Sequence, residues 1–276
     1  MSAESSRVLG SPGWLLAAWA ISGALTVMGA LCCAELAAML PKAGGQYVFF
    51  REAYGPLFGF LFGWTMFLVV QTGTIAAVAI AFAKFLGVLW PAISGTNAVL
   101  SIGSFTVSTV QLVGLIVIAV LTASNATGLK TGTRTQNVFT FAKLAALVAL
   151  TALGLALGRS GTLGAADFWR SVSPTGETQT GWVLVAALGT AMVGPLFSQS
   201  AWNNVTFAGE EIRDPARTLP RSLLFGCLLV TSVYVLANVS YLKVLPLDGI
   251  QHAPEDIKRE IVSLWLTDRA RTERPE

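Results

Sequence analysis

Six long apolar stretches run through this chain, and they restrict its possible folds more than any other feature. Each contains about 20 residues or more, the length that a helix needs to cross the hydrocarbon core of a bilayer. Hydrophobic residues make up 54% of the chain and charged residues only 12%, whereas a soluble domain has about 25% charged residues. The sequence therefore predicts an all-α, multi-pass protein of the cell membrane with no sheet. The expected spans are residues 14–40, 57–90, 105–127, 138–158, 182–207 and 223–247.

The charges between these spans predict an orientation. Lys and Arg residues gather in the loops after the first, third and fifth spans, and the positive-inside rule places those loops in the cytoplasm. Both chain ends then lie outside. We expect a single transmembrane domain over residues 1–276. It has a polar stretch at 1–13, which is too short for a signal peptide or a span, and a charged tail at 248–276.

This chain lacks the residues that several classes of function require. Cys32, Cys33 and Cys227 are scattered in apolar segments, which gives neither a disulfide framework nor metal-ligand spacing. His252 is the single histidine, so a histidine-based catalytic or zinc site would depend on one residue. No basic patch with interleaved aromatic residues indicates a nucleic-acid partner. We expect no enzyme activity, no catalytic residues, no metal site and no cofactor.

The strongest signal for function is a polar run inside an apolar stretch, FSQSAWNNVTFAGEEIRDPARTLP at residues 197–220. Pro195 precedes it and removes one helical hydrogen bond. Transporters use broken membrane helices, whose backbone groups are exposed at mid-depth, to bind charged groups and ions. The alternative is a proline kink repaired by hydroxyl groups, but the polar side chains exceed what one kink requires. They belong to Ser198, Gln199, Ser200, Asn203 and Asn204.

Two other polar features lie near the ends of spans. Lys143 lies about one turn inside the fourth span, where its ammonium group could extend to the cytoplasm or hold a fixed charge inside the bundle. After the first span, the run PKAGGQY contains Pro41, which ends a helix, and a Gly-Gly pair that permits a turn. Residues 46–54 then read as a short amphipathic helix, either a plain connector or part of an inner gate.

Several runs of this sequence resemble one family of membrane proteins. SPGWLLAAWAISGALTVMGALCCAELAAMLPKAGGQYVFFREAYGPLFGFLFGW resembles the second and third helices of amino-acid permeases in the amino acid–polyamine–organocation superfamily. NVFTFAKLAALVAL resembles their fifth helix, and FSQSAWNNVTFAGEEIRDPARTLPRSL and SVYVLANVSYLKVLP resemble their sixth and seventh. The likeness covers about residues 11–246 and is closest to the L-type amino-acid transporter branch.

This resemblance implies a partial LeuT-type bundle of inverted repeats, with substrate held where helices are broken. Phe197 matches the aromatic gate over the substrate, and Ser198 and Ser200 match the unwound stretch whose backbone meets the ammonium group of an amino acid. Trp202 and Asn203 match the Trp-Asn pair of the family beside that stretch.

The resemblance also assigns a role to Lys143. This residue matches a lysine of the fifth helix whose ammonium group replaces a sodium ion in sodium-independent members of the family.

The chain departs from the family at both ends. The Gly-Ser-Gly-Ile-Phe break of the first helix does not occur, and MSAESSRVLGSPGW resembles the sequence that follows this break. The run HAPEDIKREIVSLWLTDRARTERPE leaves the family pattern after the seventh helix. We therefore expect an incomplete copy that corresponds to family helices two to seven.

The leading interpretation of function is a secondary transporter of amino acids. A channel subunit would instead repeat polar residues along one pore face, and a scaffold or inactive fragment would need no site at all. No acidic residue within a span suits a polyamine, so the expected partners are a neutral amino acid as substrate and the lipid bilayer. The sequence does not predict an oligomeric state.

We expect the 276-residue product alone not to take up amino acids. A site of this type needs two broken helices that face each other, and an unpartnered charge at mid-membrane costs at least a few kcal/mol. Millimolar binding corresponds to only about 4 kcal/mol, so such a loss would remove most of the affinity. Uptake into proteoliposomes measures this, and saturable uptake by the chain alone would contradict the expectation.

Overall fold

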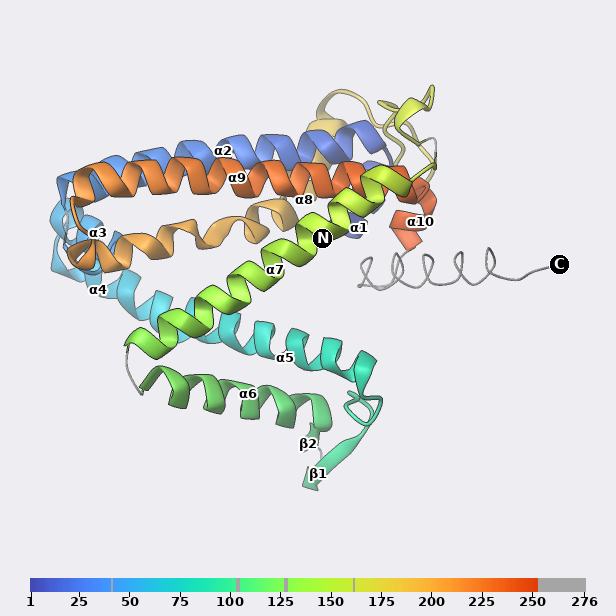
Figure 1. Ribbon diagram of the computed structural model, residues 1–276. Helices are drawn as coiled ribbons and strands as arrows, with labels where there is room; N and C mark the ends of the chain where they lie inside the picture. Colours follow the sequence, from blue (N-terminus) through green and yellow to red (C-terminus); the bar gives the residue numbers. More distant parts are fainter. Residues whose placement is uncertain (41, 103–104, 127–128, 161, 253–276) are drawn as a thin grey trace. The chain divides into compact units, whose positions relative to one another are not determined.

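The computed structural model describes residues 1–40, 42–102, 105–126, 129–160 and 162–252. Its internal contacts divide into two compact units, Met1–Gln46 with Leu144–Glu276, and Tyr47–Lys143. The described elements are mostly helices (Figure 1). The predicted tail lies almost entirely outside the described residues, as does Pro41.

Within the described residues, six segments are long and apolar enough to cross a membrane, in agreement with the predicted number of spans. Several helix boundaries differ from the predicted ones. Helix α9 begins at Pro215, before the predicted start of the last span at residue 223, so Pro220 lies inside a helix rather than in a loop. The segments are Pro12–Met39 (α2), Pro56–Leu89 (α4, η1 and α5), Thr109–Ala126 (α6), Gly132–Leu157 (in α7, Leu129–Leu157), Gly181–Phe207 (α8 and part of η3) and Pro215–Val244 (α9).

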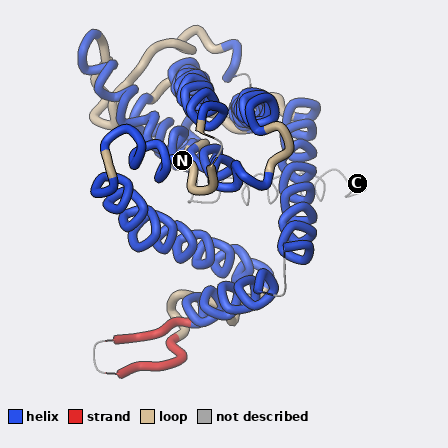
Figure 2. The backbone as a smooth tube through the Cα atoms, turned by 90° about the vertical axis from the view of Figure 1, so that its left-hand side faces the viewer, coloured by secondary structure: helices blue, strands red, loops and turns tan. Residues whose placement is uncertain are grey.

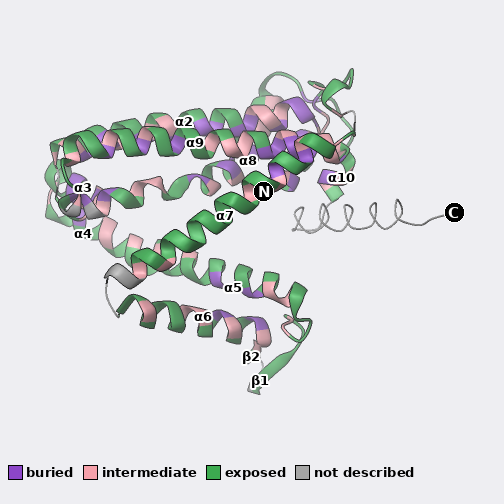
Figure 3. Cartoon of the chain, in the orientation of Figure 1, coloured by how far each residue is buried: buried purple, intermediate pink, exposed green. Residues whose placement is uncertain are grey.

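Within the first unit, α2 and α9 lie side by side along most of their length (Figure 1). A Cβ atom on Gly23 of α2 would overlap the side chain of Thr231 of α9, so the glycine permits the two backbones to approach closely. The buried positions of both helices form two apolar clusters along this contact (Figure 3). One cluster includes Leu15, Trp19, Ala237 and Tyr241, and the other includes Ala30, Ala34, Leu223 and Cys227.

The segment between α7 and α8, which includes η2 (Thr162–Gly164), is fastened to the start of α2. The amide of Gly13 donates to the carbonyl of Phe168 at 2.8 Å. Ser11, the N-cap residue of α2, donates its hydroxyl to the same carbonyl at 2.8 Å. The indole of Trp14 donates to the carbonyl of Trp169 at 2.9 Å. The first of these bonds satisfies a backbone amide at the first turn of α2 that has no partner within the helix. The other two join side chains at this helix end to carbonyls of the loop.

The second unit contains α4 (Pro56–Thr65), η1 (Met66–Gln71) and α5 (Thr72–Leu89), together with most of α3 (Gln46–Tyr54). The segment η1 is a π-helix, and such turns interrupt α-helices frequently at functional sites. Helix α6 packs on α5, with Gly114 close to Ala79 and Ile80.

One prediction about this unit was wrong. Strands β1 (Ala98–Ile102) and β2 (Phe105–Ser108) form an antiparallel hairpin before α6, although the sequence predicted no sheet and began a span at residue 105 (Figure 2). Alternation of apolar and polar residues in SFTVS has the period of a strand. The adjoining apolar helix obscured this short pattern.

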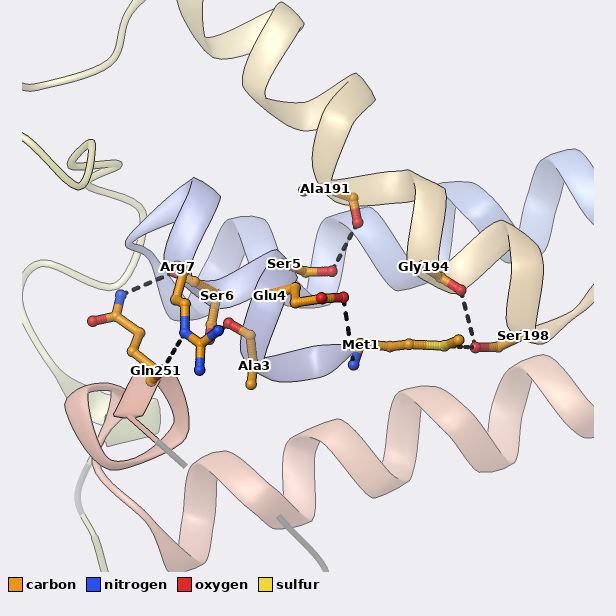
Figure 4. Close-up of polar contacts among 10 residues, drawn as sticks. All are labelled: Met1, Ala3, Glu4, Ser5, Ser6, Arg7, Ala191, Gly194, Ser198 and Gln251. Carbon is orange, nitrogen blue, oxygen red and sulfur yellow. Dashed lines mark hydrogen bonds and ion pairs between the residues drawn. The ribbon is translucent and has the colours of Figure 1, made fainter. Parts of the chain in front are cut away.

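The polar stretch at the amino terminus folds into a helix, α1 (Ser2–Leu9), which packs against α8 (Gly181–Ser198). Pro195 of α8 has no N–H, so the carbonyl of Ala191 lacks its usual partner four residues later. The buried hydroxyl of Ser5 donates to this carbonyl at 2.7 Å (Figure 4). The hydrogen bond that Pro195 removes from α8 is thus replaced by one that joins α8 to α1.

The opposite side of α1 contacts α10 (Leu247–His252). Arg7 donates to the carbonyl of Gln251 at 2.5 Å, and the side chain of Gln251 donates to the carbonyl of Ser6 at 2.9 Å (Figure 4). This short helix is therefore held by polar bonds to both α8 and α10.

We predict that Ser5→Ala lowers the free energy of unfolding by about 1–3 kcal/mol, because it leaves the buried carbonyl of Ala191 without a donor. In a Pro195→Ala background the new N–H can bond that carbonyl, so Ser5→Ala should cost much less. Chemical unfolding in detergent measures both values. Ser232→Ala is the control, since its hydroxyl bonds a carbonyl of its own helix at an exposed position. An equal cost of Ser5→Ala in both backgrounds would contradict the assignment.

Candidate functional site

The predicted interruption of the fifth span is confirmed. The α-helix α8 ends at Ser198, Gln199 leaves the helical geometry with φ −109° and ψ 9°, and a 3-10 helix, η3 (Ser200–Glu211), follows. The 3-10 segment is 12 residues long, although such runs rarely exceed about four residues. The chain therefore does not unwind fully at the break but continues in a tighter and less stable helix.

The two serines of the predicted site lie on either side of this break. Ser198 donates its hydroxyl to the carbonyl of Gly194 at 2.9 Å and lies 2.6 Å from the sulfur of Met1 at the start of α1 (Figure 4). Ser200 donates to the carbonyl of Phe197 at 2.8 Å. Both hydroxyls thus satisfy carbonyls of the last turns of α8. The carboxyl end of a helix carries partial negative charge, so the surroundings of the break suit a cation.

Phe197 lies in the last turn of α8, and its side chain is 59% exposed. Trp202 points elsewhere: its ring packs against the apolar cluster between α2 and α9 and lies next to Gly29. Of these two aromatic residues, only Phe197 has the exposure that direct contact with a substrate requires.

Asn203 connects η3 to the turn after α2. Its side chain donates to the amide oxygen of Gln46 at 3.1 Å. The amide of Gly44 donates to the carbonyl of Phe207 at 3.1 Å. Gly45 has a φ of 47° and lies against Thr206. The predicted Gly-Gly turn is therefore present and docks on the 3-10 segment.

Lys143 lies on α7 at an exposed position and is the last residue of the second compact unit along the chain. Its role as a substitute for a cation therefore stays a prediction. Lys84 of α5 is a second exposed lysine within an apolar helix, which the sequence analysis did not consider.

Two glutamines fix the break: Gln199, which the sequence already placed among its polar side chains without a role of its own, and Gln46, whose contribution the sequence did not indicate. Gln199 is 6% exposed, and its amide oxygen accepts a hydrogen bond of 2.9 Å from Thr231 of α9. Gln46 holds Asn203. The position of Gln199 between two serines in an apolar stretch is a signal for a polar contact that the sequence contains. The residues around Gln46 contain no such signal for its partner Asn203, which lies 157 residues away.

The break contains no formal charge. Residues 181–209 include no Asp, Glu, Lys, Arg or His. Any charge bound there would be met by helix-end dipoles, backbone groups, hydroxyls and amides. The side chains of residues 181–209 thus supply hydroxyls and amides but no charged acid or base.

Comparison with known proteins agrees with this chemistry. The sequence matches the Amino acid permease family over residues 1–258. It is 32% identical to the b(0,+)-type amino acid transporter 1 of Mus musculus over 235 aligned residues. The aligned part makes up 85% of this chain and 45% of that relative. It is 33% identical over 237 residues to the Large neutral amino acids transporter small subunit 2 of Homo sapiens, covering 84% of this chain and 41% of the relative.

The chain thus spans less than half the length of these relatives. The match with the family nevertheless extends through all six apolar helices and through the break in α8. The resemblance read from the sequence is confirmed, and the chain belongs to the amino acid permease family of multi-pass membrane transporters.

Proposed function

We propose that this chain forms part of a secondary transporter of neutral amino acids, and that the break between α8 and η3 receives the substrate. The observation that carries the proposal is the end of the α-helix at Ser198, inside an apolar segment that continues to Phe207. A membrane helix has no structural need for such a polar interruption, since every unpaired backbone group there raises the free energy of the protein.

The substrate ammonium group would lie at the carboxyl end of α8, near the carbonyls and hydroxyls of Ser198 and Ser200. Partial negative charge at that helix end favours a cation, and Phe197 would cover the group with its exposed ring, since aromatic faces attract ammonium ions. Trp202 and Asn203 would complete the site by holding η3 against α2 and the Gly-Gly turn.

The preference for a neutral side chain rests on the electrostatics of the same segment. A lysine-like or glutamate-like substrate would carry a net charge into residues 181–209, a stretch of 29 residues without a charged side chain. Isolated charges at membrane depth are unfavourable by several kcal/mol. A zwitterion with an uncharged side chain avoids this cost.

Lys143 would provide a fixed positive charge to the bundle and replace a bound sodium ion. An ionisable residue within an apolar helix is a functional candidate by default, and the match to the lysine of the family's fifth helix distinguishes Lys143 from Lys84. Transport would then need no sodium gradient.

A channel or scaffold is the second candidate, and the structure gives it less support. The unusual backbone and the polar side chains gather at a single break in α8 rather than along the length of one helix face.

We predict that Phe197→Ala lowers uptake of a neutral amino acid about tenfold, because loss of one aromatic contact with an ammonium group costs about 1 kcal/mol or more. The measurement is proteoliposome uptake by a form extended with the segments that the longer relatives carry. Phe225→Ala is the matched control, since Phe225 is a similarly exposed phenylalanine, 66% exposed, but lies on α9 rather than on α8. Equal uptake by both variants would refute the proposed role of Phe197.

We also predict that Lys143→Ala lowers uptake in the same extended form far more than it lowers the amount of protein at the cell surface. Lys84→Ala, which removes another exposed lysine from an apolar helix, should leave the ratio of uptake to surface protein nearly unchanged. Parallel losses of uptake and surface protein in Lys143→Ala would indicate a role in folding alone.

A further inference from the structure

Most of α3 forms a tight hairpin with the start of α4 within the second unit. The chain turns at Gly55, whose φ is 97°, and α4 begins at the next residue. A Cβ atom on Gly59 would lie 2.9 Å from the Cβ of Arg51, and one on Gly63 would lie 3.1 Å from the ring of Tyr47. These two glycines thus permit α3 to fold back along the first turns of α4.

Aromatic rings form a continuous row over this hairpin. The row consists of Phe50, Tyr54, Phe58 and Phe62, which recur every four residues across the turn. The ring centroids are 4.8 Å apart for Phe50 and Phe62, 6.1 Å for Phe50 and Tyr54, and 5.8 Å for Tyr54 and Phe58. Tyr54 is 66% exposed and Phe58 is 53% exposed. The row is therefore an exposed surface rather than a core.

The span that contains α4 is longer than the hydrocarbon core of a bilayer. Pro56–Leu89 has 34 residues, which corresponds to about 51 Å of helix, whereas the core is about 30 Å thick. A tilt of about 40°, the upper end of the usual range, accommodates only about 39 Å of helix. One end of this segment therefore lies outside the core.

Two residues indicate that the end outside the core is the beginning of α4. Lys84 is exposed in the last two turns of α5, and a charge deep in hydrocarbon is strongly unfavourable. Its ammonium group reaches water when Lys84 lies at one edge of the core, and a crossing of about 20 residues then places Trp64 at the other edge. Trp64 is 56% exposed, and tryptophan is enriched at membrane interfaces. The hairpin that precedes Trp64 then lies in the headgroup layer.

The charges of the hairpin are balanced. Arg51 and Glu52 are the only charged residues between positions 43 and 83 of the sequence. Their side chains are 3.5 Å apart and are 41% and 45% exposed. A zwitterionic headgroup similarly carries a phosphate close to an ammonium group. Arginine binds phosphate through charge-assisted hydrogen bonds, and aromatic faces attract ammonium groups. An anionic headgroup would meet no surplus of positive charge here.

We propose that the hairpin of α3 and α4 is a binding surface for zwitterionic phospholipids. The rings of Phe50, Tyr54 and Phe58 lie at the boundary between headgroups and acyl chains. Arg51 binds the lipid phosphate, and the lipid ammonium group lies over the ring of Tyr54, three residues further along the helix. The partner is a lipid because the surface is continuous with a span that begins directly after Gly55. Helix α3 is thus an interfacial helix, whatever substrate the break in α8 receives.

Lipid binding to the purified 276-residue chain tests this surface. Native mass spectrometry counts the lipids that the chain retains from detergent solutions of phosphatidylethanolamine or phosphatidylglycerol. We expect retention of phosphatidylethanolamine, and we expect Tyr54→Ala and Arg51→Gln each to lower its association constant about fivefold or more. Phe82→Ala is the control, since Phe82 is 47% exposed near the opposite end of the same span. Unchanged retention by both hairpin variants, or stronger retention of phosphatidylglycerol, would overturn the proposal.

Spin labels in a phosphatidylcholine bilayer test the depth of the hairpin. In a chain whose three cysteines are replaced by alanine, Tyr54→Cys carries the label on the hairpin. Ile75→Cys carries it in the middle of the same span, at a position that is 53% exposed. We expect oxygen and a water-soluble nickel chelate both to reach the first label, and oxygen alone to reach the second. If oxygen alone reaches both labels, or if the chelate reaches the hairpin as freely as it reaches a label in water, the placement in the headgroup layer is wrong.

Discussion

A proline inside a membrane-spanning helix leaves one carbonyl without its helical donor, and the arrangement around α8 depends on how that carbonyl is satisfied. Lipid cannot supply the missing hydrogen bond. Here Ser5 of α1 supplies it to Ala191, across 186 positions of sequence. The short polar helix α1 is therefore placed by the same proline that distorts α8, and Met1, which precedes α1, lies against Ser198 at the end of α8.

On the side away from α1, hydrogen bonds of side-chain amides hold the break in place. Gln199 reaches α9 through Thr231, and Asn203 reaches the turn after α2 through Gln46. Gly23 is needed for this arrangement because it permits α2 and α9 to approach closely. These amides hold the break on the side of α9 and of the turn after α2, while the Phe197 side chain stays exposed.

Much of this fold follows from periodicity and length. Apolar stretches of about 20 residues predict spans wherever they occur, and Pro195 together with the polar run predicts the break. The hairpin at Ala98–Ser108 escaped prediction because a four-residue alternation is weak beside an adjoining apolar helix. The contacts of Gln46, Ser5 and Gln199 could not be predicted, because each joins residues that are distant in sequence and become neighbours only after the helices pack.

The 3-10 geometry of η3 has a mechanical consequence. A 3-10 helix rises about 2.0 Å per residue and an α-helix about 1.5 Å. The 12 residues of η3 therefore span roughly 6 Å more than they would as α-helix. The Gly-Gly turn is attached to the middle of this segment, through the hydrogen bond from Gly44 to Phe207 and the contact of Gly45 with Thr206. If η3 shortened to α-helical geometry, its two ends would approach each other by about one helical turn.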